Sequence, residues 1–198
     1  MPTRGQLSPV MVAVLALLAE GPLHVYRMQQ LIRERGVDLV VNVRTRSGLH
    51  AAIDRLKRDE LIRVHAVERD AGRPERTAYA VTPAGHVALL TGLRDTLATP
   101  AREFPLFPAV VSFLHLLSPE EAREHLGRRI EALEQRLSAT DAVLTSSIDY
   151  GVPRVHLLEH EYTRDVTTVE LAWARAVVAD LAAGTLTWER YGVDPSDH

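Results

Sequence analysis

The sequence contains no cysteine among its 198 residues. This absence excludes a disulfide framework, a thiolate metal site and a cysteine nucleophile. It is compatible with a reducing cytoplasm, and we expect a cytoplasmic protein. Aromatic residues are few, at 5% of the chain, whereas 46% of residues are hydrophobic and 25% are charged. These proportions are typical of a soluble globular protein with one or two ordinary cores.

Long hydrophobic runs are absent as well. Residues 10–18 form an apolar stretch that ends at Glu20-Gly21-Pro22. A membrane span needs about 20 apolar residues, so this stretch is too short. No small-residue cleavage site follows it, as a secretory signal would require. We therefore expect a buried helix and no membrane partner.

Catalytic and metal-binding patterns are also missing. The chain has no Gly-x-Ser-x-Gly, no phosphate loop and no acidic pair beyond helical charge pairs, so we expect no enzyme and no cofactor. His156 and His160 lie four residues apart, but no further residues complete a zinc pattern around them. We expect these to be surface histidines, and we expect no metal.

The charges divide unevenly between the two halves of the chain. Residues 1–98 hold 14 Lys/Arg and 10 Asp/Glu, a balance of +4, while residues 99–198 hold 9 and 16, a balance of −7. This asymmetry favours contact between the first half and a polyanion. Two ordinary solvated surfaces would account for the charges equally well, so the pattern of elements has to decide.

Capping signals and periodicity predict the elements of the first half. Ser8-Pro9 and Thr82-Pro83 each place a capping hydroxyl before a proline at the first helical position. Apolar and polar residues alternate on either side of Gly72 and Pro74, which predicts a β-hairpin. The expected order is helix 10–19, helix 23–35, helix 48–60, strand 61–67, strand 77–81 and helix 83–97. This order is the plan of a winged helix-turn-helix domain over residues 1–98.

The third predicted helix is the candidate recognition helix. Its apolar residues share one face, with the spacing i, i+3, i+4 and i+7, and they are Leu49, Ala52, Ile53 and Leu56. In helix-turn-helix proteins the second helix of the motif lies in the major groove. Cations and the expected N-cap Ser47 precede the helix. The candidate DNA contacts here are Arg44, Arg46, Ser47, His50, Lys57 and Arg58. For each residue a solvated helix face is the alternative, and Arg55 is a candidate for pairing with an acidic neighbour.

The hairpin tip is basic. Arg69, Arg73 and Arg76 lie between the two strands, and half or more of protein–DNA hydrogen bonds go to phosphate and sugar. We expect these arginines to contact phosphates. A solubilising turn is the alternative.

Three segments carry a family resemblance. They resemble parts of PadR-type regulators. The second helix of the family resembles Glu20-Gly-Pro-Leu-His-Val-Tyr26, and its recognition helix resembles Arg46-Ser-Gly-Leu-His-Ala-Ala-Ile-Asp-Arg-Leu56. The wing of the family resembles Gly72-Arg-Pro-Glu-Arg-Thr-Ala-Tyr-Ala-Val-Thr-Pro-Ala-Gly85. Two positions depart from that pattern: Val25 replaces a glycine, and His50 stands where tyrosine is common. Since histidine still donates hydrogen bonds to phosphate, DNA binding survives the second change.

The second half is predicted to be helical. A proline-rich connector covers residues 99–107, a short helix follows over 108–117, and Ser118-Pro119 starts a long helix. A seam with steps of four and three runs through that helix, and a broad stripe runs through a last helix after Gly151-Val-Pro153. The seam comprises Leu126, Ile130, Leu133, Leu137, Thr140 and Leu144. The stripe comprises Val155, Leu158, Tyr162, Val166, Val169, Trp173, Val177 and Leu181.

The resemblance implies that residues 108–198 form a two-fold dimer. The candidate dimer contacts are Leu126, Ile130, Leu133, Leu137, Leu158, Tyr162 and Val169. An intramolecular helix pair would account for the seam equally well. Some PadR relatives bind small aromatic molecules, which makes Trp173 a candidate for an effector pocket. The alternative is that Trp173 is a packed core residue. Trp188 is expected to be a partly exposed anchor.

The fold expected from these patterns is mainly α with a small β-hairpin wing: an N-terminal winged helix-turn-helix and a C-terminal long-helix dimerisation domain. The expected function is a DNA-binding transcriptional repressor that binds a pseudo-palindromic operator as a homodimer and is released by a small-molecule effector. The alternatives are a protein-interaction module and, more remotely, a helical protein that processes small molecules. MarR-type regulators place dimer helices at both ends, whereas here they follow the wing.

Overall fold

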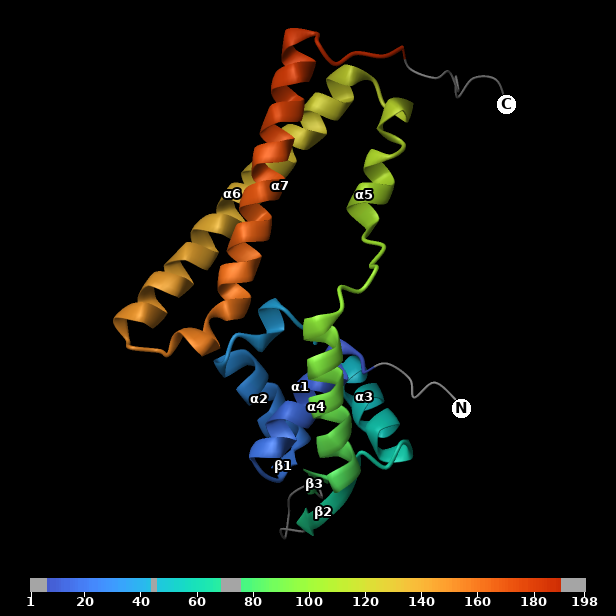
Figure 1. Cartoon of the computed structure of the whole chain (residues 1–198), viewed down its shortest axis with the longest axis vertical. Coiled ribbons are helices and arrows are strands. Elements are labelled where there is room, and N and C mark those ends of the chain that lie inside the picture. Colours follow the sequence, from blue (N-terminus) through green and yellow to red (C-terminus); the bar gives the residue numbers. More distant parts are fainter. Residues whose placement is uncertain (1–6, 44–45, 69–75, 190–198) are drawn as a thin grey trace, which may run out of the picture. The chain divides into compact units, whose positions relative to one another are not determined.

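The structure is a computed structural model that describes residues 7–43, 46–68 and 76–189. The chain divides into two compact units, residues 1–102 and 103–198 (Figure 1). The first contains α1 (Pro9–Glu20), β1 (Leu23–His24), α2 (Val25–Glu34), η1 (Val37–Leu39), α3 (Arg46–Arg58), β2 (Ile62–Glu68), β3 (Arg76–Val81) and α4 (Pro83–Ala98). The second contains α5 (Leu106–Val111), η2 (Leu114–Leu116), α6 (Pro119–Asp149), η3 (Arg154–His156) and α7 (Leu158–Ala183). The predicted fold class is confirmed.

Helix α1 is the centre of the N-terminal core. The hydroxyl of Ser8 accepts a hydrogen bond from the Met11 amide at 3.3 Å, and Pro9 follows it, so the predicted cap is confirmed. The helix buries Met11, Leu15 and Leu18 against residues of α2 and α3. Each fully buried side chain of this size contributes about 1.5–3 kcal/mol to folding. The expectation that residues 10–18 form a buried helix is confirmed.

The sheet has three strands in the order β1-β3-β2. The hairpin of β2 and β3 is as predicted. Strand β1 was not predicted, because residues 23–24 were assigned to the start of the second helix. The pairing of Leu23 with Tyr79 and of His24 with Ala78 makes these two residues a strand. No local pattern reveals two residues whose partners lie more than fifty positions away.

A junction of hydrogen bonds joins α3, β2 and α4. The Thr82 hydroxyl accepts from the Gly85 amide at 3.0 Å and donates to the Glu60 carbonyl at 2.8 Å. The Thr82 amide donates to the Leu61 carbonyl at 3.0 Å. Glu60 itself takes a left-handed conformation with φ of 56°, which turns the chain from α3 into β2. The start of α4 is therefore fixed directly to the turn after α3.

Replacing Thr82 by alanine is expected to lower the free energy of unfolding by about 1 kcal/mol, because the side chain is an N-cap. Thr82→Ser is the matched control, since it keeps the hydroxyl and its hydrogen bonds. Thermal unfolding followed by calorimetry measures both variants. Equal stability of the alanine and serine variants would contradict the role assigned to the hydroxyl.

The C-terminal unit is built on an α6–α7 pair. A capping box begins α6: the Ser118 hydroxyl accepts from the Glu121 amide at 3.2 Å, and the Ser118 amide donates to the Glu121 carboxylate at 2.8 Å. Leu126, Leu133 and Leu144 of α6 are buried, and α6 makes its main contacts with α7. The seam thus packs on a helix of the same chain, as the intramolecular alternative required.

The face of α7 that packs on α6 differs from the predicted stripe. Its buried residues are His160, Thr167, Leu171, Ala174 and Leu181. Only Leu181 was part of the stripe. Small and polar residues make this face hard to recognise from hydrophobic periodicity. The expectation that His160 is a surface histidine was wrong, because the residue is buried between the helices.

Two further details differ from the prediction. The short helix expected over 108–117 is instead α5 (Leu106–Val111) followed by the 3-10 turn η2 (Leu114–Leu116). Ser112 and Phe113 separate them, and both amides bond back to α5 carbonyls. Within residues 7–43, 46–68 and 76–189, no helix combines the length and hydropathy needed to cross a membrane.

Candidate functional site

Helix α3 presents a polar face to solvent. Leu49, Ala52, Ile53 and Leu56 are buried in the N-terminal core, which confirms the predicted apolar face. The opposite side is exposed and holds His50, Asp54, Lys57 and Arg58. A helix held by one face with donors and acceptors on the other has the geometry needed to read base edges in a major groove.

The start of α3 lies two residues earlier than predicted. Since the helix begins at Arg46, Ser47 belongs to its first turn and is not the N-cap. For Arg46, Ser47 and Arg76 the structure describes the backbone, which places the first two at the N-terminal end of α3 and the third at the start of β3. Residues 44, 69 and 73, which are the predicted contacts Arg44, Arg69 and Arg73, lie outside the described residues.

Two charged residues of α3 have partners inside the protein. The Lys57 ammonium lies over the ring of Tyr79 on β3, 5.8 Å from its centroid. This cation–π contact joins the helix to the sheet. Arg55 pairs with Asp59 at 3.7 Å, which confirms the prediction of an acidic neighbour.

Three exposed polar residues near this face were not predicted as contacts. Asp54 lies one helical turn after His50, and its carboxylate is a suitable acceptor for the cytosine amino group. Arg63 and His65 are exposed on β2. The i, i+4 spacing on α3 and the alternation along the strand are the signals that would have found them.

An ion pair holds α1 to the end of α2. Arg35 donates to both carboxylate oxygens of Glu20, and its second nitrogen lies 2.7 Å from Oε2. These hydrogen bonds lower the pKa of Glu20 below its usual value. Both side chains are about half exposed, so the pair contributes less than about 1 kcal/mol to stability.

The predicted stripe of α7 lies mostly in solvent. Tyr162 is 73% exposed and Val169 is 72% exposed, and Leu158, Val166 and Trp173 are also exposed. Of the seam residues on α6, Leu126 and Leu133 are buried within the chain, and Ile130 and Leu137 are half-buried. Among the predicted dimer residues, the most exposed ones therefore lie on α7.

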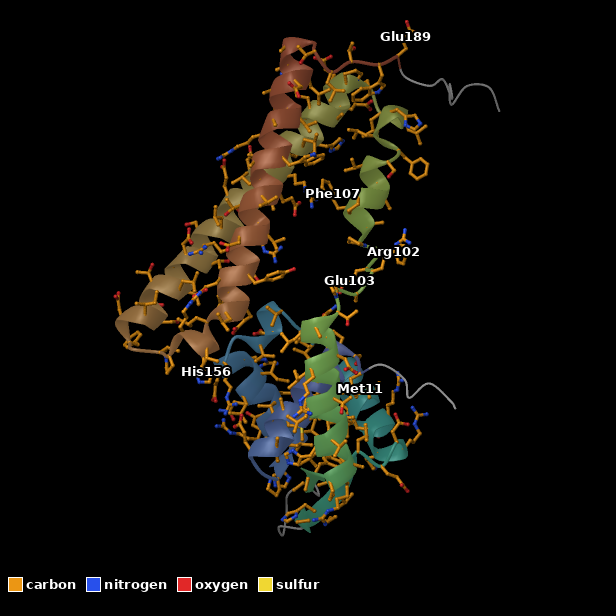
Figure 2. The ribbon with its side chains drawn as sticks, viewed as in Figure 1. Met11, Arg102, Glu103, Phe107, His156 and Glu189 are labelled. Carbon is orange, nitrogen blue, oxygen red and sulfur yellow. The ribbon has the colours of Figure 1, made fainter. Side chains whose placement is uncertain are left out.

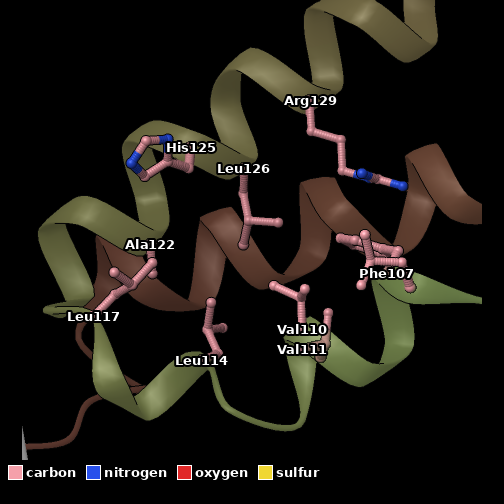
Figure 3. A pocket seen from close by; sticks show the side chains of 10 residues that line it. Phe107, Val110, Val111, Leu114, Leu117, Ala122, His125, Leu126 and Arg129 are labelled. Carbon is pink, nitrogen blue, oxygen red and sulfur yellow. The ribbon is translucent and has the colours of Figure 1, made fainter.

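A cavity lies between α5, η2 and α6, with a volume of about 560 Å³. In Figure 3, Leu126 faces Val110 and Val111, while Phe107 and Arg129 lie together at one end. Trp173 does not line the cavity but meets Phe107 edge to face, with ring centroids 5.6 Å apart. At the other end Trp188 donates its indole N–H to the Leu117 carbonyl at 2.8 Å, as a partly exposed anchor.

Histidines do not gather into a metal site in the described part of the chain. No group of three or more His, Cys, Asp or Glu side chains with suitable geometry occurs there. His156 belongs to η3, and His160 is buried on α7 beside Glu159, 3.8 Å from its carboxylate.

Residues 14–91 match the model of the transcriptional regulator PadR-like family. Residues 14–91 therefore form a PadR-like domain. The match covers most of the unit that carries α3 and the wing, and the family consists of transcriptional regulators, not enzymes. No curated protein matches the sequence.

Solved PadR structures share the fold. Bacillus subtilis PadR in complex with operator DNA is 18% identical, with a TM-score of 0.68 over 87% of this chain and 98% of that one. The same Bacillus subtilis protein in complex with p-coumaric acid is 17% identical, with a TM-score of 0.66 over 88% and 99%. A PadR-like regulator from Bacillus cereus is 15% identical, with a TM-score of 0.56 over 86% and 94%. The likeness covers both units.

Proposed function

We propose that this protein is a PadR-type repressor that binds a pseudo-palindromic operator as a homodimer. Each protomer places α3 in the major groove, with Arg46, Ser47 and His50 toward the bases, and its wing on the flanking backbone. The observation that carries this proposal is the exposed polar face of α3, which lies opposite a fully buried apolar face. The similar Bacillus subtilis PadR was solved with operator DNA.

The remaining cations have different roles in this proposal. Arg44 and Arg58 flank the reading face, and Arg69, Arg73 and Arg76 of the wing contact phosphates. Lys57 primarily holds α3 against Tyr79, because its ammonium already lies over that ring. Phosphate contacts of this kind fix the register of a protein on the duplex, while base contacts supply sequence specificity.

The exposed stripe of α7 supports the homodimer. Leu158, Tyr162 and Val169 stand on one side of the helix, and the opposite side packs on α6. A row of exposed apolar residues on a long helix is typical of a helix–helix interface. Two-fold pairing through this row presents two copies of α3 to two half-sites.

The cavity of the C-terminal unit supports control by a small effector. Phe107 and Trp173 meet at its end, and the similar PadR was solved with p-coumaric acid. A ligand releases DNA only if it binds one conformation of the dimer more tightly than the other. We place this regulated complex in the cytoplasm.

The experiment that tests the function is gel-shift binding to the DNA directly upstream of the coding region, at low and moderate salt. The wild-type protein is expected to bind this upstream DNA far more tightly than random DNA, and its affinity is expected to fall steeply as the salt concentration rises. Arg46→Ala combined with Arg73→Ala is expected to reduce affinity at least about 30-fold, since each lost contact costs about 1–3 kcal/mol, and to lower the salt slope.

Arg94→Ala combined with Arg128→Ala is the matched control, because it removes the same charge at exposed positions outside α3 and the wing. An equal loss of DNA affinity in both double variants would show that the effect comes from overall charge and not from specific contacts. Wild-type binding no tighter than to random DNA would overturn the proposal for this operator and favour a protein-interaction module.

A further inference from the structure

The cavity of the C-terminal unit is almost entirely apolar. Leu106, Phe107 and Val110 of α5 line one side, and Leu126 of α6 lines the other. Its volume of about 560 Å³ falls in the usual range for small-molecule sites, about 300–1,000 Å³. An apolar wall of this extent favours a ligand that loses little hydration when it enters.

The only ionisable side chains of the lining are His125 and Arg129. Arg129 donates from Nε to the Glu170 carboxylate at 2.6 Å, and a second nitrogen of the guanidinium contacts the same oxygen. The flat face of the guanidinium is stacked on Phe107, 3.4 Å from the ring centroid. Figure 2 places Phe107 on the side of α5 toward α6 and α7. The charge and the face of Arg129 are thus both engaged within the protein.

We propose that this cavity binds a neutral, largely apolar small molecule and discriminates against carboxylic acids. A ligand carboxylate at Arg129 would have to displace Glu170 or lie beside it as a second negative charge, and either arrangement is unfavourable in a half-buried site. The other ionisable side chain of the lining, His125, is exposed to solvent, where a pair with a carboxylate contributes little. This inference rests on the proposed function in one respect, the regulatory role of the ligand. It assigns a ligand class different from the p-coumaric acid bound by the similar PadR.

The position of the cavity in the chain connects the ligand with regulation. Its wall α5 begins at Leu106, soon after the last residue of α4, Ala98. The segment between them joins the C-terminal unit to the DNA-binding unit. A ligand that stabilises one position of α5 would therefore also affect the segment between Ala98 and Leu106.

Two dyes with one shared skeleton test the ligand class in the full-length protein. N-phenyl-1-naphthylamine is neutral, and 8-anilino-1-naphthalenesulfonate carries a sulfonate on the same body. We expect the neutral dye to bind about tenfold more tightly or better, a difference of about 1.4 kcal/mol. Quenching of Trp173 and Trp188, which border the cavity through Phe107 and Leu117, reports binding at this place.

Three variants test where the dyes bind and why the neutral dye is preferred over the anionic one. Val110→Phe fills the cavity from an exposed position without adding a tryptophan to the quenching signal, and is expected to abolish dye binding. Glu170→Gln releases the Arg129 charge and is expected to raise the affinity for the anionic dye about tenfold relative to the neutral one. Glu134→Gln is the matched control. It breaks another α6–α7 ion pair, between Glu134 and Arg175 at 2.6 Å, which lies outside the cavity lining, and it should leave the ratio unchanged.

Equal binding of the two dyes by wild type, or an unchanged ratio in Glu170→Gln, would overturn the inference. Binding that appears only when the protein is dilute would overturn it too, because a second copy of the chain would then occupy the cavity. Operator binding is measured in parallel by gel shift. Failure of dye selectivity with intact DNA binding rejects this inference alone, whereas loss of DNA binding rejects the proposed function.

Discussion

Replacing Gly85 by alanine is expected to destabilise the N-terminal unit by about 3 kcal/mol or more, because backbone must move to accommodate the new methyl group. A Cβ at this position would lie 2.0 Å from the Leu61 carbonyl oxygen and 2.8 Å from a methyl of Val81. The oxygen belongs to the chain just before β2 and accepts the Thr82 amide. Relief of the clash therefore breaks the junction that fixes α4 to the turn after α3.

Gly92→Ala is the matched control in the same helix. The nearest atom to a Cβ at Gly92 is the flexible end of Leu7, at 3.4 Å. Alanine is the better helix former, so we expect Gly92→Ala to be neutral or to stabilise by up to about 1 kcal/mol. Hydrogen exchange at amides of α1 and β3 measures the unfolding of this unit. Similar protection in the two variants would show that Gly85 is not required by close packing.

Introducing glutamate at both Tyr162 and Val169 is expected to convert the proposed dimer to monomers and to lower affinity for the proposed operator by about 10²–10⁴-fold. Both side chains are exposed on α7, so the change leaves the α6–α7 packing intact. In a two-fold interface each charge meets its own copy or an apolar neighbour. The loss of affinity follows because a monomer no longer gains from the second, linked half-site.

The control places two glutamates at Ala172 and Ala179. These residues are also exposed on α7 and also seven apart, but they lie to the side of the Tyr162 and Val169 row. We expect the control to remain dimeric. Sedimentation equilibrium gives the mass of each variant, and fluorescence anisotropy with labelled operator gives the affinity. A dimer that persists in the Tyr162 and Val169 variant would move the interface to another surface.

Helix starts were predictable where one side chain determines the local geometry. Ser8, Thr82 and Ser118 each stand before a proline, and in each case the hydroxyl accepts the expected amide. The buried face of α3 followed from periodicity alone, because a fully apolar face of one helix needs no knowledge of its partner. Local chemistry and one-helix periodicity account for most of the N-terminal unit.

The features that were missed depend on contacts between distant parts of the chain. Strand β1 exists because β3 pairs with it. On α7 the exposed stripe is more hydrophobic than the buried face, where His160, Thr167 and Ala174 pack on α6. Hydrophobicity alone identified the exposed face of α7 and not the face that packs on α6, where small side chains allow close helix approach. The pairing of Arg129 with Glu170 beside the cavity spans 41 positions.

The three-stranded sheet has a consequence for the length of the DNA half-site. Strand β1 leads directly into α2, while its partner β3 leads into Thr82 and the junction after α3. The helix-turn-helix and the described strands of the wing are thus joined at two places, through β1 and through the Thr82 junction. In the proposed complex with DNA, we therefore expect the footprint of each protomer to be a fixed length set by the protein. Operators that differ in length would have to differ in the spacer between half-sites.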